Sequence, residues 1–97
     1  MRERVIERFL HTEVARRRGT TRKMKGRIHD CDRLVIWPHG GLFKPSTASV
    51  HFVECKRPGG KARAGQLREH KRLRALGCEV YVLDTHERVL NYVRRNA

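Results

Sequence analysis

The sequence predicts an α/β fold in which a central mixed β-sheet is flanked by helices. Three observations predict this class. Apolar residues at helical spacing open the chain over residues 3–17, two apolar runs of strand length follow at 31–38 and 49–56, and a strand, a helix and a second strand then form a crossover unit. The 97 residues suffice for one such sheet with two or three helices but not for two independent cores, so we expect a single domain over 1–97.

The first predicted elements are an amphipathic helix and a short edge strand. The helix over residues 3–17 carries Val5, Ile6, Phe9, Leu10 and Val14 at helical spacing. Gly19 supplies a stop just beyond its last turn. Residues 20–25 begin with β-branched threonines and then become basic, which is typical of an edge strand whose charges discourage further pairing.

The next two strands are predicted to form an antiparallel hairpin over residues 31–57. The run "CDRLVIWP" is closed by Pro38, "HGG" supplies turn chemistry, and residues 42–48 form a long connection. The strand "SVHFVECK" then alternates its side chains between two faces. Glu54 and Lys56 therefore point the same way at the end of an apolar run.

The rest of the chain predicts a helix, a strand and a closing helix. "QLREHKRLRAL" at 66–76 has leucines at helical spacing and ends at Gly77. "CEVYVLD" at 78–84 is an apolar strand, and "THERVLNYVRR" at 85–95 begins with Thr85 as a capping residue. The last strand should run parallel to the one before the helix.

The charge balance predicts a polyanionic partner. Lysine and arginine number 23 against 10 aspartates and glutamates, which gives a formal charge of +13 and a pI near 11.0. Nucleic acid is the partner that such a surface predicts, although a solvated basic face would have the same composition. The expected DNA phosphate contacts are Arg16, Arg17, Arg18, Arg22, Lys23, Lys25 and Arg27, which fall within twelve residues, together with Arg33.

Other classes of protein are disfavoured. No apolar run approaches the ~20 residues of a spanning helix and no secretory signal opens the chain, so we expect no membrane partner and a cytoplasmic protein. The three cysteines, Cys31, Cys55 and Cys78, have no paired spacing and are expected to be reduced and mostly buried. His29 and Cys31 are too few and too close together for the paired spacings of structural zinc sites.

An acidic pair and a lysine are expected to meet where the hairpin strands end. For Glu54 and Lys56 alone, a surface ion pair would be the ordinary explanation. Asp32 on the neighbouring strand adds a second carboxylate, and oxygen ligands suit Mg²⁺. Asp32, Glu54 and the backbone carbonyl of Cys55 would then hold the metal, and Lys56 would position or deprotonate a water that attacks a phosphodiester.

Three segments carry a family resemblance. "CDRLVIWPHGG", "HFVECKRPGGK" and "GQLREHKRLRALGCEVYVLDT" resemble the VRR-NUC nucleases, a branch of the PD-(D/E)XK phosphodiesterases, and the resemblance extends from Glu3 to about Thr85. It implies a restriction-endonuclease-like core. Asp32, Glu54, Lys56 and Gln66 stand at the positions of the family's aspartate, its E-x-K motif and the glutamine that begins the next helix.

The resemblance leaves several residue roles open. Where the family usually has Gly-x-Pro-Asp, this chain has His29, Asp30, Cys31 and Asp32, so Asp30 could assist the metal or repel Asp32. Gln66 could contact a catalytic side chain or a phosphate, or could simply be a polar residue early in a helix. The family's remaining acidic residue comes from the first helix, where Glu3 and Glu7 share a face; the spacing to Gly19 favours Glu7.

The resemblance implies a metal-dependent DNA endonuclease. The expected reaction is Mg²⁺- or Mn²⁺-dependent hydrolysis of phosphodiester bonds by a homodimer on branched DNA, similar to a Holliday-junction resolvase, in a bacterial or phage-infected cell. One alternative is a monomeric flap or nicking nuclease within a replication or repair complex. The other is a non-catalytic basic DNA-binding protein, for which the ordered series Asp32, Glu54 and Lys56 would be incidental.

Overall fold

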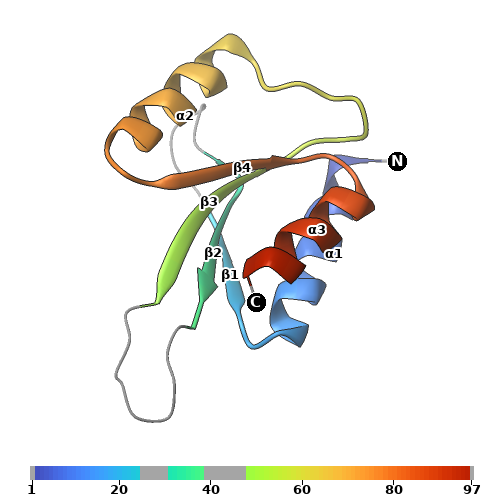
Figure 1. Cartoon of the computed structure of the whole chain (residues 1–97). Helices are drawn as coiled ribbons and strands as arrows, with labels where there is room; N and C mark the ends of the chain where they lie inside the picture. Colours follow the sequence, from blue (N-terminus) through green and yellow to red (C-terminus); the bar gives the residue numbers. More distant parts are fainter. Residues whose placement is uncertain (1, 25–30, 39–47, 97) are drawn as a thin grey trace.

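The computed structural model describes residues 2–24, 31–38 and 48–96. Their elements alternate as the sequence predicts (Figure 1). In chain order they are α1 (Glu3–Arg16), β1 (Thr20–Lys23), β2 (Arg33–Trp37), β3 (Ser49–Cys55), α2 (Ala64–Ala75), β4 (Glu79–Leu83) and α3 (His86–Asn96). Lys25, Arg27, Asp30 and the expected turn and connection between β2 and β3 lie outside the described residues.

The four strands form one mixed sheet in the order β1-β2-β3-β4. β1, β2 and β3 pair antiparallel, whereas β4 runs parallel to β3 after the α2 crossover, which confirms the predicted mixed sheet. In the antiparallel register Arg33 lies opposite Val53, and in the parallel register Cys55 lies opposite Leu83. The beginning of β2 and the ends of β3 and β4 therefore meet at one edge of the sheet.

The helices cover both faces of this sheet. α1 and α3 pack together on one face, and α2 lies on the other beside β4 (Figure 1). The core between the sheet and the α1–α3 pair comprises Ile6, Leu10, Val14, Val35, Trp37, Val53, Cys55, Leu83, Val89, Tyr92 and Val93. Within it, the Tyr92 hydroxyl accepts a hydrogen bond from Trp37 Nε1 at 3.0 Å and lies 2.7 Å from His51 Nδ1. These two contacts provide hydrogen-bond partners for the polar atoms of the aromatic side chains that the core buries.

Two glycines act at helix ends for different reasons. Gly77 has φ +95°, and the bond from Cys78 N to the Leu73 carbonyl closes α2 as predicted. At the end of α1 the left-handed residue is Arg18, with φ 69°, rather than Gly19. A Cβ on Gly19 would lie 2.6 Å from Val14 Cγ1, so glycine is needed there for close packing.

The remaining expectations for local structure are largely confirmed. Thr85 caps α3, because its hydroxyl accepts a hydrogen bond from Arg88 N at 3.0 Å. α2 begins two residues earlier than predicted, after Arg63 as its N-cap. All three cysteines are free thiols, two of them buried. None of the helices in the described part of the chain combines the length and the apolar character that a membrane span requires.

Candidate active site

Asp32 and Glu54 meet at the sheet edge where β2 begins and β3 ends. Asp32 immediately precedes β2, and its Oδ2 accepts a hydrogen bond from the backbone N–H of Cys55 at 2.8 Å. This bond fixes the aspartate against the end of β3. Carboxylate oxygens of Asp32, Glu54 and Glu3 all lie within 4.8 Å of one another. The hairpin thus brings together the two carboxylates that the sequence placed on neighbouring strands.

Of the two helix glutamates, the structure places Glu3 in this cluster, although the sequence had slightly favoured Glu7. Glu7 Oε1 instead accepts a hydrogen bond from Arg33 Nε at 2.7 Å and lies 3.6 Å from Lys23 Nζ. The two glutamates share a helix face, but one turn of α1 separates them along the axis. Only the N-terminal one reaches the edge where the other carboxylates converge. The spacing to Gly19 could not decide between them, because it does not fix how α1 is placed along the sheet.

Of the three carboxyl groups in the cluster, Glu54 has its pKa shifted most clearly from the ordinary value. Its side chain is 1% exposed, and burial, together with repulsion from Asp32, raises its pKa to about 8. Glu3 adds to this shift, whereas Lys56, whose Nζ lies 3.8 Å from Glu54 Oε2, opposes it. The site thus holds more negative charge than the nearby ammonium offsets. Crowded carboxylate oxygens of this kind fit a hard divalent cation.

Lys56 is held beside the carboxylates by Gln66. Its Nζ donates a hydrogen bond to Gln66 Oε1 at 3.0 Å, and its backbone N–H donates to the Leu83 carbonyl at 2.9 Å. The lysine is 9% exposed, so little of it is free to move in solvent. Gln66 Oε1 also accepts a hydrogen bond from Arg63 N at 2.9 Å. Gln66 therefore links the start of α2 to the lysine.

Cys55 takes part in the candidate active site through its backbone rather than through its thiol. Its side chain is fully buried in the core, and burial, with Asp32 as the next cause, raises the pKa of the thiol, which stays protonated. Its N–H is engaged by Asp32. The thiol is therefore excluded as a nucleophile at ordinary pH.

The sequence analysis did not identify His70 and Cys31 as neighbours of Glu54, although one potential ligand atom of each lies within 4.8 Å of a Glu54 carboxylate oxygen. His70 is 1% exposed on α2, and its Nε2 lies 3.6 Å from Glu54 Oε1. Burial, with Arg74 and Lys56 nearby, lowers the pKa of His70, so the imidazole is neutral at ordinary pH. The available signal was its place four residues after Gln66, on the same face of α2.

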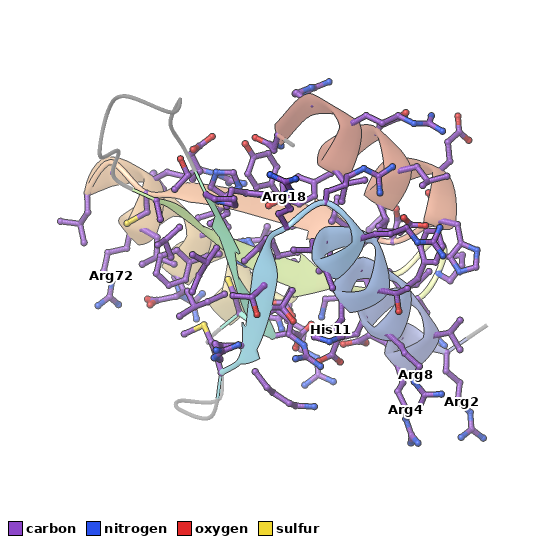
Figure 2. All side chains as sticks on the ribbon, turned by 90° about the horizontal axis from the view of Figure 1, so that it is seen from below. Arg2, Arg4, Arg8, His11, Arg18 and Arg72 are labelled. Carbon is purple, nitrogen blue, oxygen red and sulfur yellow. The ribbon has the colours of Figure 1, made fainter. Side chains whose placement is uncertain are left out.

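The basic residues predicted to contact DNA are mostly paired within the protein. Arg16 and Arg17 lie 3.7 and 2.7 Å from Glu13, and Arg22 donates to Thr20 Oγ1 at 2.9 Å. Arg33 and Lys23 both face Glu7, as described above. Arg18 lies exposed at the turn after α1 (Figure 2). Many of the basic residues that were predicted to bind DNA from their density in the sequence therefore have partners within the protein.

A second basic surface lies on the first half of α1. The side chains of Arg2, Arg4 and Arg8 project together from it (Figure 2). None of the three makes an ion pair within the described residues. A pocket of about 170 Å³ opens beside them, lined by Arg4, Glu7, Arg8, His11, Lys23 and Arg33. The sequence analysis did not single these arginines out, because they are interleaved with apolar and acidic residues of the helix.

Further cationic side chains surround Lys56. A pocket of about 370 Å³ is lined by Glu3, Lys56, Arg57, Gly60, Lys61 and Arg63. A Cβ on Gly60 would lie 2.9 Å from the Arg57 carbonyl, so the turn after β3 requires glycine there. The carboxylate cluster and the cationic side chains of Arg57, Lys61 and Arg63 therefore lie at the same edge of the sheet.

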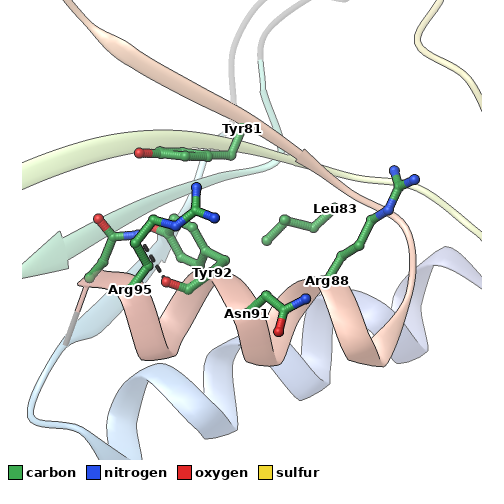
Figure 3. A pocket seen from close by; sticks show the side chains of 7 residues that line it. Tyr81, Leu83, Arg88, Asn91, Tyr92 and Arg95 are labelled. Atoms are coloured by element: carbon green, nitrogen blue, oxygen red, sulfur yellow. Dashed lines mark hydrogen bonds between the residues drawn. The ribbon is translucent and has the colours of Figure 1, made fainter.

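Another pocket, of about 240 Å³, lies between β4 and α3 (Figure 3). Tyr81 and Leu83 line its strand side, and Arg88 and Arg95 extend from the helix. The carboxylate cluster contributes none of its lining residues. It is therefore separate from the candidate active site.

Comparisons with known proteins agree with this arrangement. No family model matches the sequence. A protein of Acyrthosiphon pisum secondary endosymbiont phage 1, named "Putative nuclease p44", is 44% identical over 89 residues, which are 90% of this chain and 87% of that protein. A solved structure described as "VRR_NUC domain" superposes with a TM-score of 0.81 and 28% identity, over 98% of this chain and 97% of that one. With its mixed sheet and carboxylate cluster, the chain belongs to the VRR-NUC family of nucleases.

Proposed function

We propose that this chain hydrolyses phosphodiester bonds of DNA with the help of Mg²⁺ or Mn²⁺. The observation that carries the proposal is the convergence of Glu3, Asp32 and Glu54 within 4.8 Å, with the pKa of Glu54 raised to about 8. These carboxylates, with the backbone carbonyl of Cys55, would hold the cation. When bound, the cation would neutralise them and stabilise the charge that develops on the phosphate.

The protein's own groups would orient the attacking water. Lys56 is fixed by Gln66 and lies next to Glu54 Oε2, so its Nζ can hold a water or a phosphate oxygen at the edge of the cluster. As an ammonium it would donate hydrogen bonds, and as a neutral amine it would accept the proton of the water. Gln66 is a positioning residue, because it acts through Lys56.

DNA binding would come from the cationic side chains on either side of the cluster. Arg57, Lys61 and Arg63 line the pocket that contains Lys56, and Arg4 and Arg8 line the pocket on α1. Such groups contact phosphates without reading bases, which suits an enzyme that recognises DNA shape. A formal charge of +13 supports a polyanionic substrate. The similarity to a phage protein supports a place in the cytoplasm of a bacterial or phage-infected cell.

The preferred substrate is proposed to be branched DNA cut by a homodimer. Resolution of a four-way junction needs two symmetric incisions, whereas one chain offers a single set of Asp32, Glu54 and Lys56. A two-fold dimer supplies the second set. The described large apolar residues that are exposed are Val5 on α1, Val50 on β3, Leu67 on α2 and Leu76 just after α2, while α3 offers none.

The test is cleavage of labelled linear, nicked, flapped and four-way-junction DNA, beside a measurement of solution mass. We expect Asp32→Ala, Glu54→Ala and Lys56→Ala each to abolish cleavage while DNA binding persists. Glu87→Ala, which removes an exposed carboxylate on α3, is the matched control and should cut normally. If any of the three site variants cuts at the parental rate, the assigned site is wrong. If the protein is a monomer in solution and cuts flapped DNA better than four-way junctions, the function is that of a flap nuclease rather than a junction resolvase.

A further inference from the structure

A second group of potential metal ligands lies behind the carboxylate cluster. Cys31, Glu54 and His70 each offer a ligand atom, and these atoms lie within 4.8 Å of one another. All three side chains are buried, with exposures of 2%, 1% and 1%. Unlike the carboxylate set, this group combines sulfur, nitrogen and oxygen donors.

The polar atoms that face this group are unsatisfied. Both ring nitrogens of His70 and Oε1 of Glu54 are buried and have no hydrogen-bond partner in the described parts of the chain. The 3.6 Å between His70 Nε2 and Glu54 Oε1 is too long for a hydrogen bond. Leaving such a group buried and unpaired destabilises the folded state. The unsatisfied Oε1 of Glu54 and Nε2 of His70 therefore face each other, and with the neighbouring Cys31 thiol they point to a ligand that would complete them.

We propose that Cys31, Glu54 and His70 form a binding site for a thiophilic divalent cation, with Zn²⁺ as the physiological ion. Thiolate, imidazole and carboxylate are the donors that Zn²⁺ accepts, whereas Mg²⁺ disfavours sulfur. Ligands about 2.0–2.3 Å from a tetrahedral zinc ion lie roughly 3.3–3.8 Å from one another. The 3.6 Å between His70 Nε2 and Glu54 Oε1 falls within that range, so at most small side-chain movements would close the site. On binding, the Cys31 thiol would release its proton to solvent.

The two ligand sets share Glu54. Its Oε1 faces His70, and its Oε2 faces Lys56, 3.8 Å away. A thiophilic ion that draws Glu54 toward His70 and Cys31 would compete with the hard cation for that carboxylate. Zn²⁺ would therefore inhibit cleavage that Mg²⁺ supports. This consequence rests on the proposed function, whereas binding of the ion itself does not.

Co²⁺ absorption spectroscopy of the reduced, metal-free protein tests binding independently of cleavage. Co²⁺ takes the place of Zn²⁺ and gives a near-ultraviolet charge-transfer band only when a thiolate binds it. We expect this band in the parental protein and its disappearance when Zn²⁺ is added. Its absence would overturn the proposal, and His70 and Glu54 would then be left as an interacting buried pair.

Matched variants identify the ligands. Cys31→Ser should abolish the band, and His70→Gln should weaken Co²⁺ binding more than about tenfold. Cys78→Ser removes a thiol outside the cluster, and Asp32→Asn removes a carboxylate of the other set, so both should keep the band. Circular dichroism would verify that each variant is folded. A band that survives Cys31→Ser, or one lost in Cys78→Ser, would overturn the assignment.

The inhibitory consequence is tested by adding Zn²⁺ to Mg²⁺-dependent cleavage. We expect inhibition of the parental protein and at least about tenfold weaker inhibition of Cys31→Ser. Equal inhibition of both proteins would overturn the competition, even if Co²⁺ binds as expected. Failure of cleavage under all conditions would count against the proposed function alone, because the spectroscopic result would still stand.

Discussion

The ammonium of Lys56 and the first turn of α2 are joined through one oxygen atom. Gln66 Oε1 accepts hydrogen bonds from Lys56 Nζ at 3.0 Å and from Arg63 N at 2.9 Å. Lys56 follows the end of β3, so this contact ties the orientation of the lysine to the docking of the helix. A side chain with many rotamers is thereby held in one direction.

Gln66→Ala should lower the rate of cleavage at saturating DNA by about 10- to 100-fold, because Lys56 would no longer be held in place. DNA affinity should be unchanged, since most phosphate contacts remain. Single-turnover cleavage and a binding titration measure the two effects separately. Glu87→Ala, at an exposed site on α3, is the control and should cut normally. An unaltered cleavage rate in Gln66→Ala would show that Lys56 does not depend on this contact.

Glu54→Gln should stabilise the metal-free protein at pH 8. The folded-state pKa of Glu54 is about 8, against 4.5 for an ordinary glutamate, so the folded state binds more protons between these values. The free energy of unfolding therefore falls as pH rises from about 4.5 to 8, and the amide removes this loss. We expect a gain of about 2–4 kcal/mol at pH 8 and little below pH 5, measured by denaturant unfolding.

The control for this measurement is Glu87→Gln, at an exposed site on α3, which should show no such pH dependence. Mg²⁺ should stabilise the parental protein at pH 8 more than the Glu54→Gln variant, because the cation relieves the same repulsion. A Glu54→Gln variant that is less stable at pH 8 than at pH 5, relative to the parent, would contradict the raised pKa.

Glu3→Gln and Glu7→Gln should have different effects, although both remove one charge from the same helix. Glu3 lies within the carboxylate cluster, so its loss should raise the Mg²⁺ concentration required for cleavage about tenfold or more. Glu7 pairs with Arg33, so its loss should mainly reduce stability, by about 1–3 kcal/mol, because a partly buried guanidinium loses its partner. Mg²⁺ titrations of cleavage and denaturant unfolding distinguish the two. Equal metal requirements for both variants would contradict the assignment of Glu3.

Much of the fold followed from local patterns. Alternation through "SVHFVECK" placed Glu54 on the face opposite Val53 and Cys55, and Gly77 and Thr85 ended or began helices where expected. The pairing of β2 with β3 followed from their proximity in sequence. These features depend on short-range periodicity and turn chemistry, which a single sequence displays.

Features that depend on how elements dock could not be read from local patterns. Glu3 rather than Glu7 joins the carboxylates because of how α1 lies along the sheet, which no helical period specifies. Arg17 and Arg33 were predicted to contact DNA because they are basic. In the fold, Arg17 forms an ion pair with Glu13 and Arg33 with Glu7. His70 reaches Glu54 only because α2 covers that face of the sheet.

The arginines of α1 should contribute more to DNA binding than the paired arginines after it. Arg4 and Arg8 are exposed and line a basic pocket beside Lys23, whereas Arg17 lies 2.7 Å from Glu13. Each phosphate contact releases counterions, so a residue that binds DNA increases the steepness with which affinity falls with salt. Arg4→Ala and Arg8→Ala should each reduce that slope by about 1, and Arg17→Ala by much less.

Binding titrations of catalytically inactive Glu54→Ala over a range of salt concentrations provide the measurement, because cleavage cannot then alter the substrate. Arg17→Ala is a matched control, since it removes the same charge from the same region of the chain. Its ion pair with Glu13 already neutralises that charge at short range, so its removal alters the field at a phosphate less than removal of Arg4 or Arg8 does. If Arg17→Ala flattens the salt dependence as much as Arg4→Ala, the residues after α1 form the DNA surface after all, and DNA binding must open their contacts with Glu13.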